Sequence, residues 1–240
     1  MAPRPEAAVR SLLRILLAQE RFSLRWLRRS WLRLTLVFVG VLLPMWAFAE
    51  LADEIHERET IGFDEPVLLF AREIGTPALD RFFVLVSWIG YAWGVVPFDI
   101  ALVLLLALWR RYREAMFAAL ALGGSGLLNV LTKHVFARER PSLWESIAPE
   151  TTFSFPSGHA MGSATLAWVL LLLSWPTRWR WPVLLAMATF VLLVGFSRVY
   201  LGVHYPSDIL AGWAAASTWA VAVYLIVFRG RRPWTRGATG

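Results

Sequence analysis

Long runs of apolar residues, separated by short polar segments, dominate this 240-residue sequence. Hydrophobic residues make up 58% of the chain, and they lie in continuous runs rather than in the one-sided stripes of helices from soluble proteins. A run of about 20 apolar residues is long enough to cross a bilayer as a helix. The runs therefore predict an all-α membrane protein, a bundle of six spans at 31–49, 82–109, 115–136, 159–175, 182–200 and 206–228. Gly94 and Pro97 interrupt the second of these, which is expected to be a tilted or kinked span.

Positive charge is distributed unevenly around the six predicted spans. An even number of spans leaves both termini on one side of the membrane, and 17 of the 24 Lys and Arg residues fall on that side. Cytoplasmic segments of membrane proteins carry such an excess. We therefore expect a multi-pass protein of the inner (cytoplasmic) membrane with cytoplasmic termini. The net charge of +7 reflects this topology, so no nucleic-acid partner is expected.

Two polar segments lie outside the predicted spans. Residues 1–30 carry seven arginines among Leu, Ile, Phe and Trp, which indicates a basic amphipathic helix on the membrane surface or a basic tail that only sets topology. Residues 50–80 are acidic and are expected to form a loop with a short helix near 66–73. The chain thus divides into a basic interfacial segment at 1–30, a membrane domain at 31–228 and a basic cytoplasmic tail at 229–240.

The stretch 155–160 joins a polar loop to an apolar run. Ser157 is a preferred helix N-cap, so a helix is predicted to begin here. The free N–H groups of its first turn and the helix dipole favour an anion, and His159 adds a titratable imidazole. This combination suits a phosphate group, although a Ser-Gly cap beside a His also occurs in many proteins without that role.

Three cations are predicted near the same side of the membrane. Lys133 and Arg140 are seven residues apart, so they would share a helix face until Pro141 ends the helix. Arg198 closes the fifth span, where an unpaired charge is costly. Such cations often only snorkel to the interface. Around one cavity, however, they would hold a phosphate dianion in place of a metal ion, and no cofactor is expected. The chain has no Cys, which excludes thiol chemistry.

His204 and Asp208 lie four residues apart around the start of the last span. A carboxylate that accepts a hydrogen bond from one imidazole nitrogen raises the basicity of the other, as a nucleophilic histidine requires. His159 would then protonate the leaving oxygen. The alternative is that Asp208 only caps the last helix.

Together these clusters resemble the motifs of the type 2 phosphatidic acid phosphatase superfamily, which also includes vanadium haloperoxidases. The matching residues lie within about 80–228 and are Lys133-x6-Arg140-Pro141, Pro156-Ser157-Gly158-His159 and Ser197-Arg198-x5-His204-x3-Asp208. The resemblance implies a metal-independent membrane phosphatase in which His204 becomes phosphorylated, Asp208 orients it and His159 is the general acid. It also implies that the phosphate is bound by Lys133, Arg140, Ser157, Gly158 and Arg198.

The sequence therefore predicts hydrolysis of a lipid phosphate or diphosphate through a phosphohistidine intermediate, at the outer face of the membrane. Undecaprenyl diphosphate, phosphatidylglycerol phosphate and phosphatidic acid all fit as substrates. A vanadate-dependent haloperoxidase-like enzyme would use the same anion site, but six spans count against it. A lipid transporter or scramblase would need the helices without the two histidines.

Overall fold

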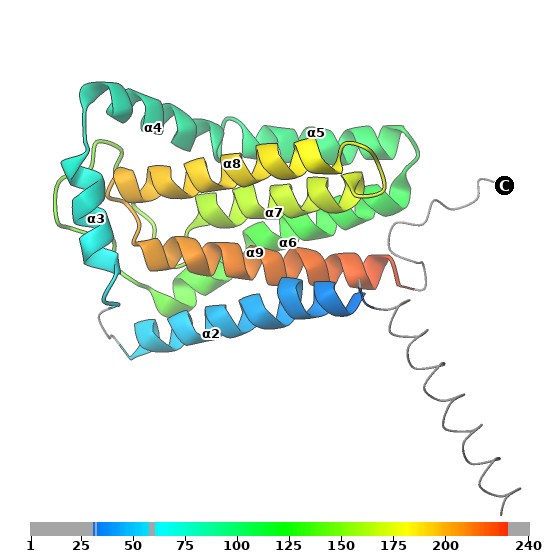
Figure 1. The fold of residues 1–240 in the computed structure, drawn as a ribbon, viewed down its shortest axis with the longest axis horizontal. Helices are drawn as coiled ribbons and strands as arrows, with labels where there is room; N and C mark the ends of the chain where they lie inside the picture. Colours follow the sequence, from blue (N-terminus) through cyan, green and yellow to red (C-terminus); the bar gives the residue numbers. More distant parts are fainter. Residues whose placement is uncertain (1–30, 32, 58–60, 230–240) are drawn as a thin grey trace, which may run out of the picture.

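The computed structural model of the chain describes residues 31, 33–57 and 61–229. All regular structure in this part is helical, as predicted (Figure 1). The predicted interfacial helix at 1–30 and almost all of the predicted tail lie outside the described residues. The elements are η1 (Phe38–Leu42), α2 (Leu43–His56), α3 (Asp64–Glu73), α4 (Pro77–Ile89), α5 (Val95–Leu108), α6 (Tyr112–Phe136), α7 (Gly158–Ser174), α8 (Arg180–Tyr200) and α9 (Pro206–Val227).

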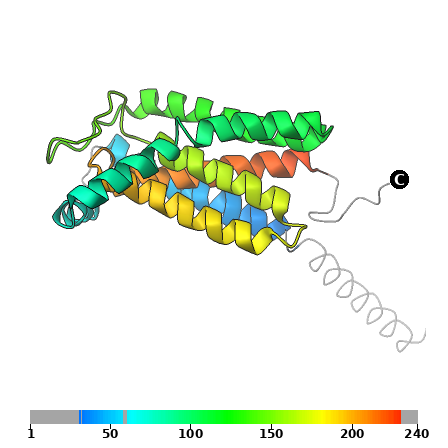
Figure 2. The ribbon, with the colours of Figure 1, turned by 90° about the horizontal axis from the view of Figure 1, so that it is seen from above.

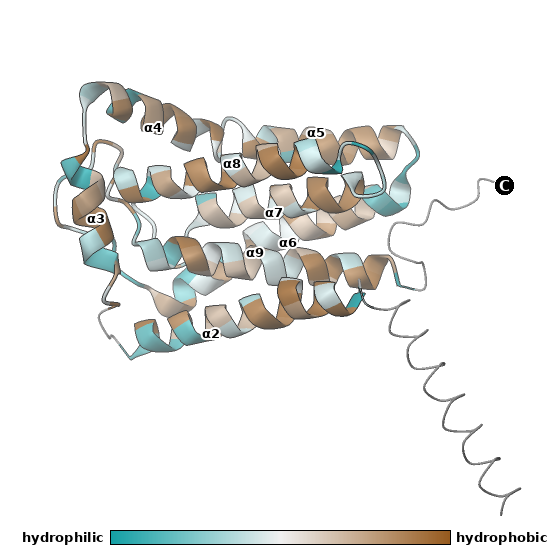
Figure 3. Ribbon diagram, in the orientation of Figure 1, coloured by the Kyte–Doolittle hydropathy of each residue, from teal (hydrophilic) through white to brown (hydrophobic). Residues whose placement is uncertain are grey.

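Four helical stretches in the described part are long and apolar enough to cross a membrane. They are Arg33–His56, Tyr112–Phe136, Arg180–Tyr200 and Pro206–Val227, and α5 and α7 are shorter apolar helices. Figure 3 shows hydrophobic residues along most of the helix lengths and hydrophilic ones mainly at the two ends of the bundle. Large apolar side chains face outward, Trp93 with 78% of its surface exposed and Leu185 with 72%. An apolar outer surface of this kind suits lipid rather than water.

The predicted span at 82–109 is not one helix, because the chain breaks it into α4 and α5. A turn at 90–94 separates the two, and the Trp93 N–H donates to the Trp88 carbonyl oxygen at 3.2 Å. A Cβ on Gly94 would lie 2.1 Å from the carbonyl oxygen of Ile89, so this turn requires glycine there. The two helices follow each other along one side of the bundle (Figures 1 and 2).

Helices α7 and α9 form the centre of the bundle. Helix α9 packs against α2, α6 and α7, while α8 covers the other side of α7. Helix α3, the short helix predicted near 66–73, runs across one end of the bundle (Figure 1). The turns α5–α6 and α7–α8 lie at the opposite end, where Phe117, Val169 and Tyr224 belong to the largest buried cluster. The polar motifs are thus confined to the α3 end.

The end of α6 differs from the prediction for Lys133 and Arg140. We expected one helix to carry both residues as far as Pro141, but α6 ends at Phe136. Ala137 has the left-handed φ of 45°, and its N–H donates to the Lys133 carbonyl oxygen. The chain therefore turns away from the helix axis, and the two cations reach their partners from different elements.

Candidate functional site

Three segments far apart in the sequence meet at the α3 end of the bundle: the loop 137–157, the start of α7 and the turn between α8 and α9. Ser157 caps α7, its Oγ accepting a hydrogen bond from the Ala160 N–H at 3.4 Å. The Ser157 N–H itself donates to the Asp208 carbonyl oxygen at 3.1 Å. A Cβ on Gly158 would lie 3.0 Å from Asn129 Oδ1 of α6. The second predicted motif is therefore held directly between α6 and α9.

His204 is fully buried in the turn before α9. Its Nε2 lies 3.1 Å from Arg140 Nη1, and its Nδ1 lies 3.4 Å from Asp208 Oδ2. Because a guanidinium can only donate, Nε2 must accept, so the ring proton is on Nδ1, which faces both Ser154 Oγ at 3.3 Å and Asp208 Oδ2. Burial lowers the pKa of His204 well below 6.5, and the Arg140 and Arg198 charges lower it further. The imidazole is therefore neutral, with its Nε2 lone pair directed toward Arg140.

A carboxylate from the loop, that of Glu150, lies between the two predicted catalytic histidines. It pairs with Arg140 Nη2 at 2.7 Å and with Arg198. Its oxygens lie 3.8 Å from His159 Nδ1 and 3.9 Å from His204 Nε2. Burial alone would raise the pKa of Glu150, but the Arg198 and Arg140 charges outweigh burial and hold this pKa below its usual range. We call Glu150, Arg140 and Arg198 the Glu150 cluster.

His159 and Lys133 lie at the edges of this cluster. The His159 ring, in the first turn of α7, stacks on Tyr91 with 4.9 Å between ring centroids. Lys133 faces the loop instead of the carboxylate, and its Nζ donates to Thr152 Oγ1 at 2.9 Å and to the Phe153 carbonyl oxygen at 2.7 Å. The structure therefore brings both histidines, Arg140 and Arg198 around one anion, with Lys133 outside their direct contacts.

A second set of ion pairs surrounds Asp208 from the side away from His204. Arg138 donates from Nη1 to Asp208 Oδ1 at 2.6 Å and from Nη2 to Asp64 Oδ2 at 2.9 Å. Burial alone would lower the pKa of Arg138, but Asp208 and Asp64 outweigh burial and raise it. We call Arg138, Asp64 and Asp208 the Asp208 cluster.

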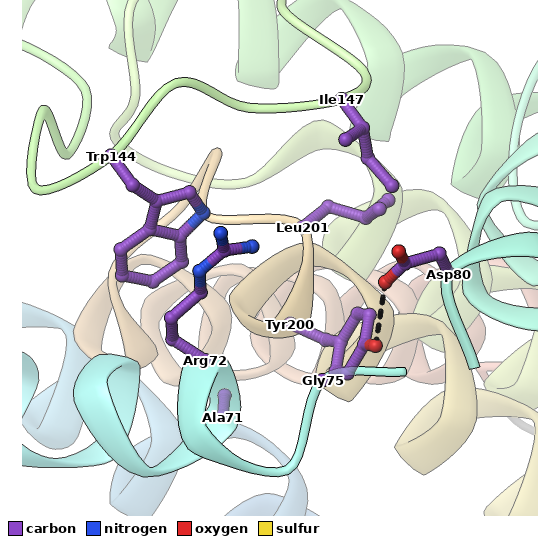
Figure 4. Close-up of a pocket in the computed structure, with 8 residues that line it drawn as sticks. All are labelled: Ala71, Arg72, Gly75, Asp80, Trp144, Ile147, Tyr200 and Leu201. Carbon is purple, nitrogen blue, oxygen red and sulfur yellow. Dashed lines mark hydrogen bonds between the residues drawn. The ribbon is translucent and has the colours of Figure 1, made fainter. Parts of the chain in front are cut away.

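A small pocket lies nearby, between α3, the loop and the end of α8 (Figure 4). Arg72 lies over the Trp144 ring on one side, and the Tyr200 hydroxyl donates to Asp80 at 2.7 Å on the other. Its volume of about 10 Å³ has room for roughly one water molecule, so a lipid headgroup does not fit there. Within the described part of the chain, no three His, Asp or Glu side chains gather as a metal ion would require.

Three residues of the two clusters were absent from the sequence-based site. Arg138 lies two residues before Arg140, but nothing in the sequence separates its charge from one that only faces solvent. Glu150 lies in an irregular loop, and Asp64 is one of several acids in the segment 50–80. Motif spacing along helices could not find these residues, because their positions depend on how a loop and α3 fold back over the bundle.

Known proteins resemble this chain along most of its length. A family model described as the PAP2 superfamily matches residues 114–232. Phosphatidylglycerophosphatase B of Bacillus subtilis is 30% identical over 172 residues, covering 70% of this chain and 84% of the relative. An undecaprenyl-diphosphatase of Sulfolobus acidocaldarius is 31% identical over 169 residues, covering 68% and 78%. The crystal structure of a transmembrane PAP2 type phosphatidylglycerolphosphate phosphatase from Bacillus subtilis aligns with a TM-score of 0.69 at 26% identity, covering 79% of this chain and 98% of that one.

Proposed function

Because this chain belongs to the PAP2 superfamily, we propose that it hydrolyses a phosphate or diphosphate group on a membrane lipid. Similar proteins are a phosphatidylglycerophosphatase and an undecaprenyl-diphosphatase, so both kinds of lipid phosphate are within the proposed substrate class. Phosphatidic acid carries the same terminal group. The observation that carries the proposal is the position of the Glu150 carboxylate, an anion held by two arginines between two histidines.

A phosphate group in the place of this carboxylate would make the contacts that the reaction requires. Arginine forms paired hydrogen bonds with phosphate oxygens as it does with carboxylates. Arg140 and Arg198 would bind the phosphate directly, and Lys133, Ser157 and Gly158 would complete the site from its edges and from the start of α7. The three cations would stabilise the charge of the phosphoryl transition state, so we propose a metal-independent reaction.

The proposed reaction has two steps through a phosphohistidine. His204 Nε2 attacks phosphorus in line with the lipid oxygen, so a P–N bond forms while the P–O bond to the lipid breaks. Asp208 holds Nδ1–H and stabilises the charge that develops on the ring. Protonated His159 gives its proton to the departing lipid oxygen. Neutral His159 then takes a proton from water, whose oxygen attacks phosphorus, breaks the P–N bond and releases inorganic phosphate and free His204.

We propose six membrane passes, formed by α2, the α4–α5 pair, α6, α7, α8 and α9. The α4–α5 pair counts as one pass because the two helices run on in the same direction (Figures 1 and 2). The arginine-rich turns at 110–113 and 178–180 lie at the end opposite α3, which supports a cytoplasmic position for that end. The site would then open at the outer face of the inner membrane, level with lipid headgroups. Residues 1–30 and 229–240 would lie on the cytoplasmic side.

Phosphate release from purified protein in detergent tests the proposal. Phosphatidylglycerol phosphate, undecaprenyl diphosphate and phosphatidic acid would be offered separately, with and without EDTA. We expect at least one to be hydrolysed equally with and without the chelator, and His204→Ala to abolish this activity. His134→Ala is the matched control, because His134 is exposed on α6 and lies outside both clusters. Full turnover by His204→Ala would contradict the assigned nucleophile, and loss of activity in EDTA would contradict the metal-independent reaction.

A further inference from the structure

Asp64 is buried, whereas most of the other described acids of the segment 50–80 are exposed. Its side chain is 5% exposed, at the first turn of α3. Oδ1 accepts a hydrogen bond from the Ser207 N–H at 2.9 Å, and Oδ2 accepts from Ser207 Oγ at 2.5 Å and from Arg138 Nη2 at 2.9 Å. A carboxylate is buried without large cost only when it is paired in this way. The hydrogen bonds from Ser207 connect α3 to the start of α9, close to His204, the proposed nucleophile.

Arg138 joins Asp64 to Asp208 through one planar group. Nη1 donates to Asp208 Oδ1 at 2.6 Å and to Ser207 Oγ at 2.8 Å, while Nη2 donates to Asp64 Oδ2. The guanidinium also lies over the Tyr205 ring, with 4.1 Å from Cζ to the ring centroid. A guanidinium fixed at both ends of its fork and on one face has a single orientation.

The two oxygens of Asp208 have different partners. Oδ1 faces Arg138, whereas Oδ2 accepts from the Ser154 hydroxyl and from the Tyr205 N–H at 2.9 Å and faces His204 Nδ1 at 3.4 Å. A rotation of the carboxylate that broke the Arg138 contact would also move Oδ2 away from the imidazole. The orientation of His204 is therefore coupled to Asp64 through Arg138 and Asp208.

We propose that Asp64 and Arg138 are positioning residues for the nucleophile. They fix the plane of the Asp208 carboxylate, and they thereby set the direction in which His204 Nε2 points. This inference rests on the proposed function. Neither residue touches the reacting atoms, and neither contacts the Glu150 carboxylate. They act on the chemical step and leave phosphate binding by Arg140 and Arg198 unchanged.

Adjacent acids on α3 provide a matched pair of variants. Asp64→Asn removes the charge that holds Arg138 Nη2, while Glu65→Gln removes an exposed charge from the same helical turn. Partners that orient a metal ligand contribute roughly 10- to 100-fold to activity, and we expect a similar range for partners that orient a nucleophile. We expect Asp64→Asn to lower kcat about 10-fold. KM for the lipid and the inhibition constant of inorganic phosphate should stay within about twofold, because the anion-binding arginines are intact. Glu65→Gln should change none of the three.

A double variant tests whether Asp64 acts through Arg138. Arg138→Lys keeps the positive charge but loses the fork, so it should also lower kcat about 10-fold or more. Adding Asp64→Asn to Arg138→Lys should then lower kcat by less than about twofold, because the link is already broken. A buried structural contact without a positioning role would change the melting temperature and leave the kcat of the folded enzyme unaltered.

The outcomes separate this inference from the proposed function. Wild-type kcat in Asp64→Asn, with activity abolished in His204→Ala, would overturn the positioning role alone. A parallel rise of KM and of the phosphate inhibition constant would also overturn it, because Asp64 would then support the anion site. Wild-type turnover in His204→Ala would overturn the proposed function itself. If Asp64→Asn does not fold, Arg138→Lys decides, since an unchanged kcat there excludes the role.

Discussion

The Glu150 cluster and the Asp208 cluster lie beside each other at the α3 end of the bundle, and one arginine of each, Arg140 and Arg138, lie two residues apart in the chain. Both clusters join arginine to carboxylate at distances below 3 Å. They differ in what surrounds the carboxylate. The Glu150 side chain is 27% exposed on an irregular loop, whereas Asp64 and Asp208 are 5% and 0% exposed in the first turns of α3 and α9.

The difference indicates that similar ion pairs have opposite uses in this protein. We propose that Glu150 leaves the arginines when a stronger anion arrives, because its loop is free of regular structure and its side chain is partly exposed. Asp208 cannot leave, since the backbone of α9 carries it and four neighbours hold it. One cluster is therefore suited to exchange its anion, and the other to hold the proposed nucleophile His204 in a fixed orientation during that exchange.

The largest expected effect comes from the residue that links the Asp208 cluster to His204. Asp208→Asn keeps the size of the side chain but removes the charge that selects the ring tautomer. By analogy with hydrolases in which an acid orients a histidine, kcat should fall about 10³- to 10⁴-fold. The measurement is single-turnover hydrolysis by protein that elutes as wild type in detergent. A loss below about 10-fold would show that the carboxylate only caps α9.

Substituting Met for Arg138 and, separately, for Arg140 tests whether the two clusters have different roles. Arg138→Met leaves two buried carboxylates unpaired and should destabilise the fold by about 3–5 kcal/mol. Arg140→Met leaves one partly exposed carboxylate, which keeps Arg198, and the carbonyl oxygens of Thr152 and Val203 without this donor, so it should destabilise the fold less than Arg138→Met does and lower kcat/KM about 100-fold or more. Thermal unfolding in detergent and kinetics would be measured for both. Equal destabilisation by the two variants would contradict the distinction between the clusters.

Removal of the resident anion would sharpen the comparison further. Glu150→Gln removes the charge that competes with phosphate for Arg140 and Arg198, so inorganic phosphate should inhibit at a concentration several-fold lower, roughly three- to tenfold. Glu139→Gln, in the same loop and exposed, is the control. Weaker inhibition by phosphate in Glu150→Gln would mean that Glu150 belongs to the binding site and does not compete with its ligand.

The smallest expected effect is the response to mild acid. The lowered pKa of His204 keeps its imidazole neutral below pH 6.5, the ordinary value for histidine, so the nucleophile is not lost as the pH falls through that value. After correction for ionisation of the substrate phosphate, kcat/KM should fall by less than about twofold between about pH 7.5 and about pH 6. A half-maximal loss near pH 6.5 would indicate an imidazole in ordinary surroundings.

The sequence predicted those parts of the site that local pattern controls. Ser157 caps α7 and α9 begins at Pro206, because capping and helix spacing depend on a few neighbouring residues. The predicted helix through Lys133 and Arg140 was wrong, since the left-handed turn at Ala137 has no signal as clear as a glycine. The left-handed conformation of Ala137 ends α6 at Phe136, two residues before Arg138.

The sequence could not predict contacts that depend on long loops. Glu150 reaches Arg198, 48 residues away, and Asp64 reaches Arg138, 74 residues away, through the fold of the loop 137–157 and the crossing of α3. Gly94 and Pro97 predicted a kink or tilt in the span at 82–109. The complete separation of α4 from α5 depends on the close approach of Gly94 to the Ile89 carbonyl oxygen. The importance of Glu150 and Asp64 is therefore visible only in the structure, where they pair with Arg198 and Arg138.

The central claim, that His204 is the nucleophile at the anion held by Arg140 and Arg198, is tested most directly by trapping the phosphorylated enzyme. Protein mixed with a ³²P-labelled lipid phosphate would be denatured within one turnover, and the labelled peptide would be identified. The account predicts label that is stable to alkali and labile to acid on His204, and none in His204→Ala. Label on another residue, or turnover with no labelled protein at any time, would contradict it.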